Sequence, residues 1–178
     1  MRYPLLRLSQ AELLLCLLCS PLSAQNGAPH AAWVTVGAGL GTLARNSSSE
    51  PAWGLSGIVD GSYQRTNTLI SVRLAATVPL DYGDGLVDCA VLLGRATDLQ
   101  SHYAALSIGL GLGRRSAPDD QSWSLGASAA ARTEVNARPI GLGLYGFGHL
   151  GRDSFAGVAL TISIGEHRPL RVVRGRGA

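Results

Sequence analysis

Lysine is absent from this 178-residue sequence, so arginine supplies all 15 basic charges, which face 12 acidic residues. Charged residues of both signs make up 15% of the chain, whereas a typical soluble domain has about 25%. The surface of a soluble protein normally mixes lysine with glutamate and aspartate. The shortage of charge therefore disfavours an ordinary soluble domain, and the length leaves room for one domain.

Clustered basic residues are also scarce. The arginines are spread along the chain, whereas nucleic-acid binding favours arginines gathered on one face with interleaved aromatic residues. The densest basic run is the segment 167–178, which we interpret as a solvated C-terminal tail. We therefore expect no nucleic-acid partner.

The N-terminal segment 1–24 has the pattern of a removed signal peptide. Arg2 and Arg7 supply positive charge, the stretch 13–18 is apolar, and Ala24 offers a small residue for cleavage. That apolar stretch is far shorter than the ~20 residues that cross a bilayer as a helix. We therefore expect an exported protein without a helical membrane anchor.

Cysteine is scarce, with three residues in the chain. Cys16 and Cys19 lie in the predicted signal peptide, and each follows a leucine, which disfavours processing as a lipoprotein. Removal of the segment leaves Cys89 alone, so the mature chain can form no intramolecular disulfide and no cysteine metal site. Cys89 shares a face with valines and a leucine, which favours the role of a small hydrophobic residue.

From Trp33 onward, apolar residues recur at every second position, and no stretch keeps a helical period for more than a turn. The pattern predicts eight strands of about ten residues, enough for a tilted strand to cross a hydrocarbon core of ~30 Å. The predicted strands are Trp33–Leu43, Trp53–Gln64, Thr68–Val78, Gly85–Ala96, His102–Arg114, Trp123–Val135, Pro139–Gly148 and Phe155–Glu166.

The connections alternate in length along the chain. The longer ones, rich in Ser, Asp, Gly and Pro, cover 44–52, 79–84, 115–122 and 149–154, while 65–67, 97–101 and 136–138 are generally shorter. Small outer-membrane barrels place short turns and both chain ends on the periplasmic side. An even strand count satisfies this, and closure leaves no strand edge unpaired. We therefore predict an all-β, eight-stranded antiparallel up-and-down transmembrane barrel over 33–166, preceded by a linker at 25–32.

The two faces of the predicted strands differ in chemistry. In the fifth strand, Leu106, Ile108, Leu110 and Leu112 share one face, while Ser107, Gly109, Gly111 and Gly113 share the other. In a membrane the aliphatic face would meet lipid and the polar face would line the lumen. This arrangement predicts a lumenal charge network formed by Asp60, Arg73, Asp88, Arg132 and Glu134.

Charges enclosed in such a lumen should pair, because an isolated buried charge costs several kcal/mol. Arg73 and Asp88 lie on strands joined by one hairpin, at nearly equal distances from its turn, and are the first candidate pair. An eight-stranded barrel is just wide enough to be filled by its own side chains. We therefore expect a plugged interior rather than an open pore.

Aromatic residues gather near the ends of the predicted strands, where amphipathic rings favour the bilayer interface. We expect interface positions for Trp33, Trp53, Tyr63, Tyr103, Trp123 and Phe155.

In its strand count, alternation and connection lengths, the chain resembles the class of small eight-stranded outer-membrane barrels that includes the OmpA transmembrane domain and OmpX. The stretch 140–148 with Ser154-Phe-Ala-Gly-Val158 is similar to a group of uncharacterised bacterial outer-membrane proteins. The resemblance implies membrane lipid and the outer-membrane assembly machinery as partners, with a monomeric state. The chain departs from the class in having a basic tail where those barrels usually end in a terminal aromatic.

Two other functions remain open. His149, Asp153 and Ser154 lie together in the last long connection, and a lipid-modifying enzyme would need a histidine, a carboxylate and a serine. No spacing supports a metal site. The glycines near Gly109 alternate with leucine inside a strand instead of opening a helix as in a nucleotide loop, so we expect no cofactor.

The second alternative is a soluble periplasmic barrel that packs its aliphatic residues inside around a small apolar ligand. Alternation alone does not distinguish inside from outside. Faces of Gly, Ala and Ser with scattered arginines make a poor water-facing coat, so we favour the bacterial outer membrane with a structural or surface-interaction role.

Overall fold

The computed structural model describes residues 30–44, 51–81, 84–99, 102–116, 123–137 and 139–166. The predicted signal peptide at 1–24, most of the linker and the basic tail at 167–178 lie outside the described residues. Eight strands make up the described chain: β1 (His30–Ala44), β2 (Ala52–Arg65), β3 (Thr68–Pro79), β4 (Gly85–Leu99), β5 (His102–Ser116), β6 (Trp123–Ala137), β7 (Ile140–Leu150) and β8 (Ser154–Glu166).

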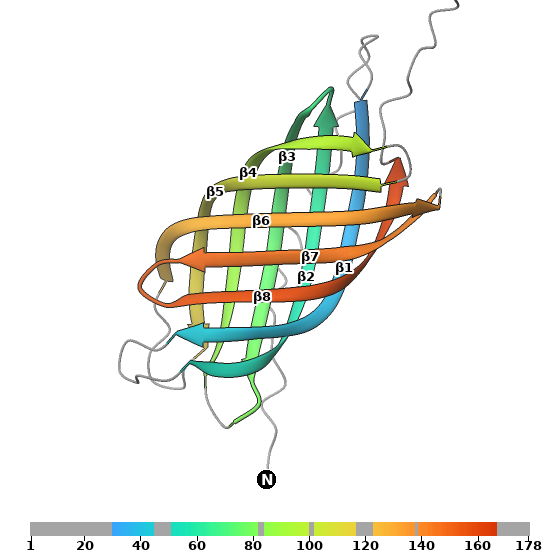
Figure 1. The fold of residues 1–178 in the computed structure, drawn as a ribbon. Coiled ribbons are helices and arrows are strands. Elements are labelled where there is room, and N and C mark those ends of the chain that lie inside the picture. The colour runs from blue at the N-terminus through green and yellow to red at the C-terminus, as the bar shows by residue number, and fades with distance from the viewer. Residues whose placement is uncertain are drawn as a thin grey trace, which may run out of the picture.

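The eight strands form one closed barrel (Figure 1), in which each strand pairs antiparallel with its neighbours in sequence. Pairing of β1 with β8, in which Ala32 aligns with Glu166 and Ala44 with Ser154, closes the sheet. Closure gives every strand two partners, so no edge is left exposed. The prediction of an eight-stranded antiparallel barrel is confirmed. Within the described residues, no helix is long and apolar enough to cross a membrane.

Strand boundaries differ from the sequence prediction by a few residues. Strand β1 begins at His30, so the last three residues of the predicted linker belong to the barrel. Strand β7 begins at Ile140 and continues to Leu150, so it includes His149, which the sequence placed in a loop. Strand β7 has 11 residues and β8 has 13, one more in each case than the predicted strands Pro139–Gly148 and Phe155–Glu166.

The pleat divides the barrel into an aliphatic outer face and a polar interior. Leu106 and Leu160 point outward with 68% and 72% of their surface exposed, whereas Arg73 is 0% exposed. The outer wall also carries exposed leucine, isoleucine and valine from all eight strands. The orientation expected for a membrane barrel is therefore the one observed, with aliphatic residues outside and charged ones enclosed.

Two clusters of buried apolar residues lie inside the barrel, beside the polar groups. One extends from the end with the longer connections toward the middle and includes Leu43, Leu86 and Phe155. The other lies at the short-turn end around Trp33, Leu69 and Tyr103. At Gly39 and Gly109, an added Cβ would lie 1.9 Å from a backbone carbonyl oxygen of the paired strand, so these inward positions admit no side chain.

Candidate functional site

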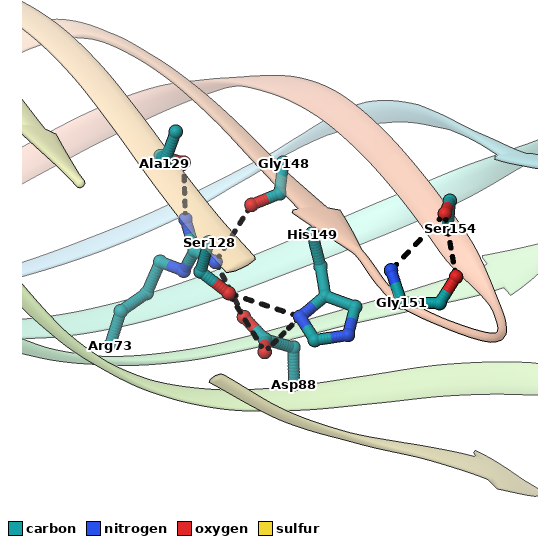
Figure 2. Close-up of polar contacts among 8 residues, drawn as sticks. All are labelled: Arg73, Asp88, Ser128, Ala129, Gly148, His149, Gly151 and Ser154. Atoms are coloured by element: carbon teal, nitrogen blue, oxygen red, sulfur yellow. Dashed lines mark hydrogen bonds and ion pairs between the residues drawn. The ribbon is translucent and has the colours of Figure 1, made fainter. Parts of the chain in front are cut away.

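One polar group in the lumen is centred on Arg73 of β3 (Figure 2). Its Nη2 lies 2.5 Å from Oδ2 of Asp88 on β4, the neighbouring strand of the hairpin. Arg73 also donates to the backbone carbonyls of Ala129 and Gly148, at 2.7 and 3.2 Å, across the barrel. The side chains of both ions are fully buried, so the carbonyls supply polar partners that water would otherwise provide.

His149 and Ser128 complete this group, which we call the Arg73 cluster: Arg73, Asp88, Ser128 and His149. His149 Nδ1 lies 3.0 Å from Asp88 Oδ1 and 3.0 Å from Ser128 Oγ. Ser128 Oγ also donates to Asp88 Oδ1 at 3.3 Å. Asp88 therefore contacts groups on three other strands, which ties β3, β6 and β7 to β4.

A second group, the Asp60 cluster, contains Asp60, Ser62, Arg132 and Tyr145. Arg132 Nη1 lies 3.4 Å from Asp60 Oδ1, and Tyr145 Oη donates to Asp60 Oδ2 at 3.0 Å. Ser62 also donates to Asp60, and Arg132 donates to Ser62 at 2.7 Å. Asp60 on β2 and Arg132 on β6 are not on neighbouring strands, so this ion pair bridges the lumen.

Aromatic rings surround the Arg132 guanidinium. Its carbon atom lies 4.9 Å from the ring centre of Trp33, 5.5 Å from Tyr103 and 5.8 Å from Tyr145. A cation over an aromatic face is attracted by the ring quadrupole, more strongly where water is excluded. Trp33 and Tyr103 also pack edge to face, with ring centres 5.4 Å apart. These rings lie inside the barrel toward the short-turn end.

Glu134 forms a third contact across the interior. Ser163 Oγ donates to Glu134 Oε1 at 2.8 Å, and Thr35 Oγ1 lies 2.8 Å from the same serine oxygen. These hydroxyls link β6 to the pair of strands that closes the barrel.

The five charged residues predicted to line the lumen all point inward and are at most 6% exposed. Arg73 pairs with Asp88, and Asp60 pairs with Arg132. The sequence reasoning missed Tyr145, Ser62, Ser128 and His149 as partners of these charges. Strand alternation would have placed them inside, since each shares a face with an inward glycine or charged residue.

Three of the six aromatic residues predicted at the membrane interface are positioned differently. Trp53 and Trp123 are 60% and 54% exposed on the outer wall, and Tyr63 also points outward. Trp33, Tyr103 and Phe155 are buried in the lumen, so the interface prediction is wrong for them. The physical reason is strand parity: Trp33 shares its face with Thr35, and its outward neighbour is Val34.

The catalytic candidates His149, Asp153 and Ser154 do not come together. His149 points into the lumen toward Asp88, whereas Ser154 Oγ bonds the backbone of Gly151 (Figure 2). Asp153 lies 3.8 Å from Arg115, which also pairs with Asp84 at 3.1 Å on the same rim. Ser154 aligns with Ala44 on β1 and follows the outward parity of β8, so the pleat separates it from His149.

His149, Asp88 and Ser128 also lack the geometry of a nucleophilic relay. Such a relay needs the carboxylate on one ring nitrogen and the serine on the other. Here both contacts are made by Nδ1, while Nε2 has no hydrogen-bond partner among the described residues. The described residues also contain no group of three or more His, Cys, Asp or Glu side chains placed to hold a metal ion.

No protein-family model and no curated protein sequence matches the chain. Solved structures do match it in fold. Neisserial surface protein A (NspA) superposes with a TM-score of 0.61 and 15% sequence identity, covering 75% of this chain and 96% of that one. Ail, the attachment invasion locus protein of Yersinia pestis, gives a TM-score of 0.56 and 10% identity over 78% of this chain and 99% of that one.

Ail in complex with the heparin analogue sucrose octasulfate matches with a TM-score of 0.50 and 12% identity, covering 76% of this chain and 98% of that chain. At these identities the likeness establishes the fold alone. The chain has the fold of the small eight-stranded outer-membrane β-barrels, the class that its sequence resembles.

Proposed function

We propose that this protein is an integral outer-membrane β-barrel with a structural or surface-interaction role and a lumen plugged by its own side chains. The observation that carries the proposal is the outer wall, where aliphatic residues from all eight strands are exposed. Monomeric soluble proteins rarely expose apolar patches beyond a few hundred Å². A continuous apolar wall around a barrel is stable in lipid.

The strand lengths suit this placement. The 13 residues of β8 extend about 43 Å, which corresponds to a height of roughly 30–35 Å at the 35–45° tilt of membrane barrels. The hydrocarbon core of a bilayer is about 30 Å thick. Trp53 and Trp123, exposed at the start of β2 and β6, then lie near the boundary on the side with the longer connections.

The interior argues against the soluble ligand-binding alternative. That function needs an apolar cavity enclosed by leucine, isoleucine and valine, with polar residues on the outside. Here the enclosed residues include the Arg73 cluster and the Asp60 cluster, and the exposed ones are aliphatic. An apolar ligand would have to displace paired charges, which is unfavourable.

The same interior supports a closed barrel. The Arg73 cluster, the Asp60 cluster and the rings of Trp33 and Tyr103 lie along the lumen between its two ends. Two ion pairs held by carbonyls and hydroxyls are expensive to separate, so conduction would cost the broken contacts. The end with the longer connections is then the part available for contacts outside the cell. NspA is named as a surface protein and Ail as an attachment invasion locus protein, which is consistent with such a role.

Fractionation combined with gel mobility tests the membrane placement. The protein should appear in the outer-membrane fraction, require detergent for extraction, and migrate faster before heating than after, because a folded barrel resists unfolding in the gel. Recovery from the soluble periplasm without detergent would overturn the proposal. Planar bilayer recordings test the plug separately: the purified barrel should give no steps in current at moderate voltage, and stable steps would contradict it.

A further inference from the structure

The outer wall carries a row of polar residues at the short-turn end. His30 of β1 aligns with Arg65 of β2, Arg65 aligns with Thr68 of β3, and Thr68 aligns with Arg95 of β4. All four side chains are on the outward face and exposed. Neighbouring strands lie about 4.8 Å apart, so the Cα atoms of Arg65 and Arg95 are about 10 Å apart across Thr68. Their long side chains can therefore converge over the threonine.

Neither arginine of this row has an ion-pair partner among the described residues, and the row itself contains no acidic residue. Glu166 lies on β8, the other neighbour of β1, and aligns with Ala32. Strand β1 therefore separates it from Arg65 and Arg95. Arg73, Arg115 and Arg132 are all paired with aspartates. Arg65 and Arg95 thus form a cationic position that the described chain does not neutralise.

A hollow in the outer wall lies directly next to this row. It has a volume of about 290 Å³ and is lined by residues of β1, β2, β3 and β8, among them the outward residues Val34, Gly61, Tyr63 and Ile70. A second hollow of about 100 Å³ continues beyond Gly61 to Val59 and Cys89. The absence of a side chain at Gly61 opens the groove, because an added Cβ there would meet nothing within 4 Å.

The cationic row and the groove meet in a fixed geometry. Arg65 and Tyr63 are consecutive outward residues of β2, as Thr68 and Ile70 are of β3. The groove therefore begins beside Arg65 and Thr68 and runs away from the short turns. From Tyr63 to Val59 it extends about 13 Å along the strand at ~3.3 Å per residue, enough for much of an acyl chain.

We propose that this row and groove bind an anionic phospholipid. The phosphate lies over Thr68 between Arg65 and Arg95, and one acyl chain lies in the groove at Gly61. Charge complementarity selects an anionic headgroup, and the aliphatic lining selects a chain. The site rests on the proposed membrane placement, in which the short-turn end faces the periplasm and meets the inner leaflet.

Native mass spectrometry of the detergent-purified full chain tests the site with two probes of equal acyl length, dioleoyl phosphatidylglycerol and dioleoyl phosphatidylcholine. The wild type should retain phosphatidylglycerol preferentially. The double variant R65Q/R95Q should weaken its retention roughly 30-fold, since each surface arginine near an anionic leaflet contributes about a factor of five to six. The double variant R114Q/R152Q, at the opposite end, is the matched control and should retain the wild-type preference.

Two glycine variants test the groove. Gly61→Leu fills the hollow, and Gly57→Leu adds the same side chain to the same outward face outside it; neither added Cβ meets an atom within 4 Å. Gly61→Leu should lower the retention of dioleoyl phosphatidylglycerol, and Gly57→Leu should leave it unchanged. Glycerol 3-phosphate, which has the headgroup chemistry without a chain, should not compete.

Unchanged phosphatidylglycerol retention in R65Q/R95Q would overturn the proposal, as would equal retention of phosphatidylcholine or full competition by glycerol 3-phosphate. Each variant is first checked for the heat-dependent gel shift in the outer-membrane fraction. A protein that shifts there but shows no lipid preference refutes only the lipid site. A protein absent from the membrane fraction refutes the membrane placement as well.

Discussion

Replacing Asp88 with asparagine should destabilise the barrel strongly, although the two side chains have nearly the same shape. The substitution leaves Arg73 charged and buried without a counter-ion. Removal of one partner from a buried ion pair costs about 3–5 kcal/mol. Arg73 keeps its bonds to the carbonyls of Ala129 and Gly148 in the variant. We therefore expect a loss near the lower end, about 3 kcal/mol of unfolding free energy.

A double-mutant cycle isolates the ion pair from the other contacts of Asp88. R73M alone should also cost several kcal/mol, whereas R73M/D88N should cost clearly less than the sum of the single changes, with a coupling energy of about 2 kcal/mol or more. Ser71→Ala is the control, since Ser71 lies on the same inward face two residues from Arg73 and its hydroxyl has no partner among the described residues.

Urea unfolding of protein refolded in lipid vesicles, followed by the heat-dependent gel shift, measures these free energies. Unfolding free energies of D88N and Ser71→Ala that agree within about 0.5 kcal/mol, the ordinary range for surface changes, would refute the reasoning. A coupling energy near zero would show that Arg73 is held by the carbonyls alone.

Three further changes test other parts of the barrel. Ile108→Arg places a charge near the middle of the exposed aliphatic face of β5 and should cost about 2–4 kcal/mol of unfolding free energy, measured with urea. Leu150→Arg, at the rim end of β7, should cost only about 0–1 kcal/mol. Equal costs would contradict a membrane-spanning wall. Gly109→Ala should destabilise the barrel by about 1–3 kcal/mol, because the added Cβ meets a carbonyl oxygen. Gly57→Ala should not, because its Cβ lies in open space. Equal unfolding midpoints for the two variants would disprove the tight inward packing. Ser154→Ala should leave the lipid composition of the outer membrane unchanged in mass spectra, because Ser154 bonds Gly151 rather than His149; a lost lipid species would revive the enzyme alternative.

Strand alternation predicts most of the fold because each residue of a pleated strand belongs to one of two faces. The contrast between Leu106 and Ser107 and the contrast between Leu160 and Thr161 both predict which side is enclosed once a membrane is assumed. The Arg73 and Asp88 pair could be foreseen because both residues lie on one hairpin, where the distance from the turn sets the register. The spacing of the two residues from the hairpin turn is therefore enough to predict this contact.

Contacts across the lumen could not be predicted in the same way. Asp60 and Arg132 are 72 positions apart and lie on strands that do not pair, so their contact depends on the diameter of the closed barrel. The positions of Trp33, Tyr103 and Phe155 were predictable in principle. Their strand parity places them inside, and parity, not nearness to a strand end, decides where the ring points.

The β1 and β8 ladder has a consequence for how the barrel is assembled. All other ladders join strands adjacent in sequence, whereas this seam joins the first strand to the last. Ser163 links strands at this seam, because its hydroxyl contacts Thr35 on the first strand and Glu134 on the sixth. Loop closure over so long a chain has to precede the contacts that reward it. The barrel therefore cannot close before β8 is present, so closure depends on the last strand of the described chain.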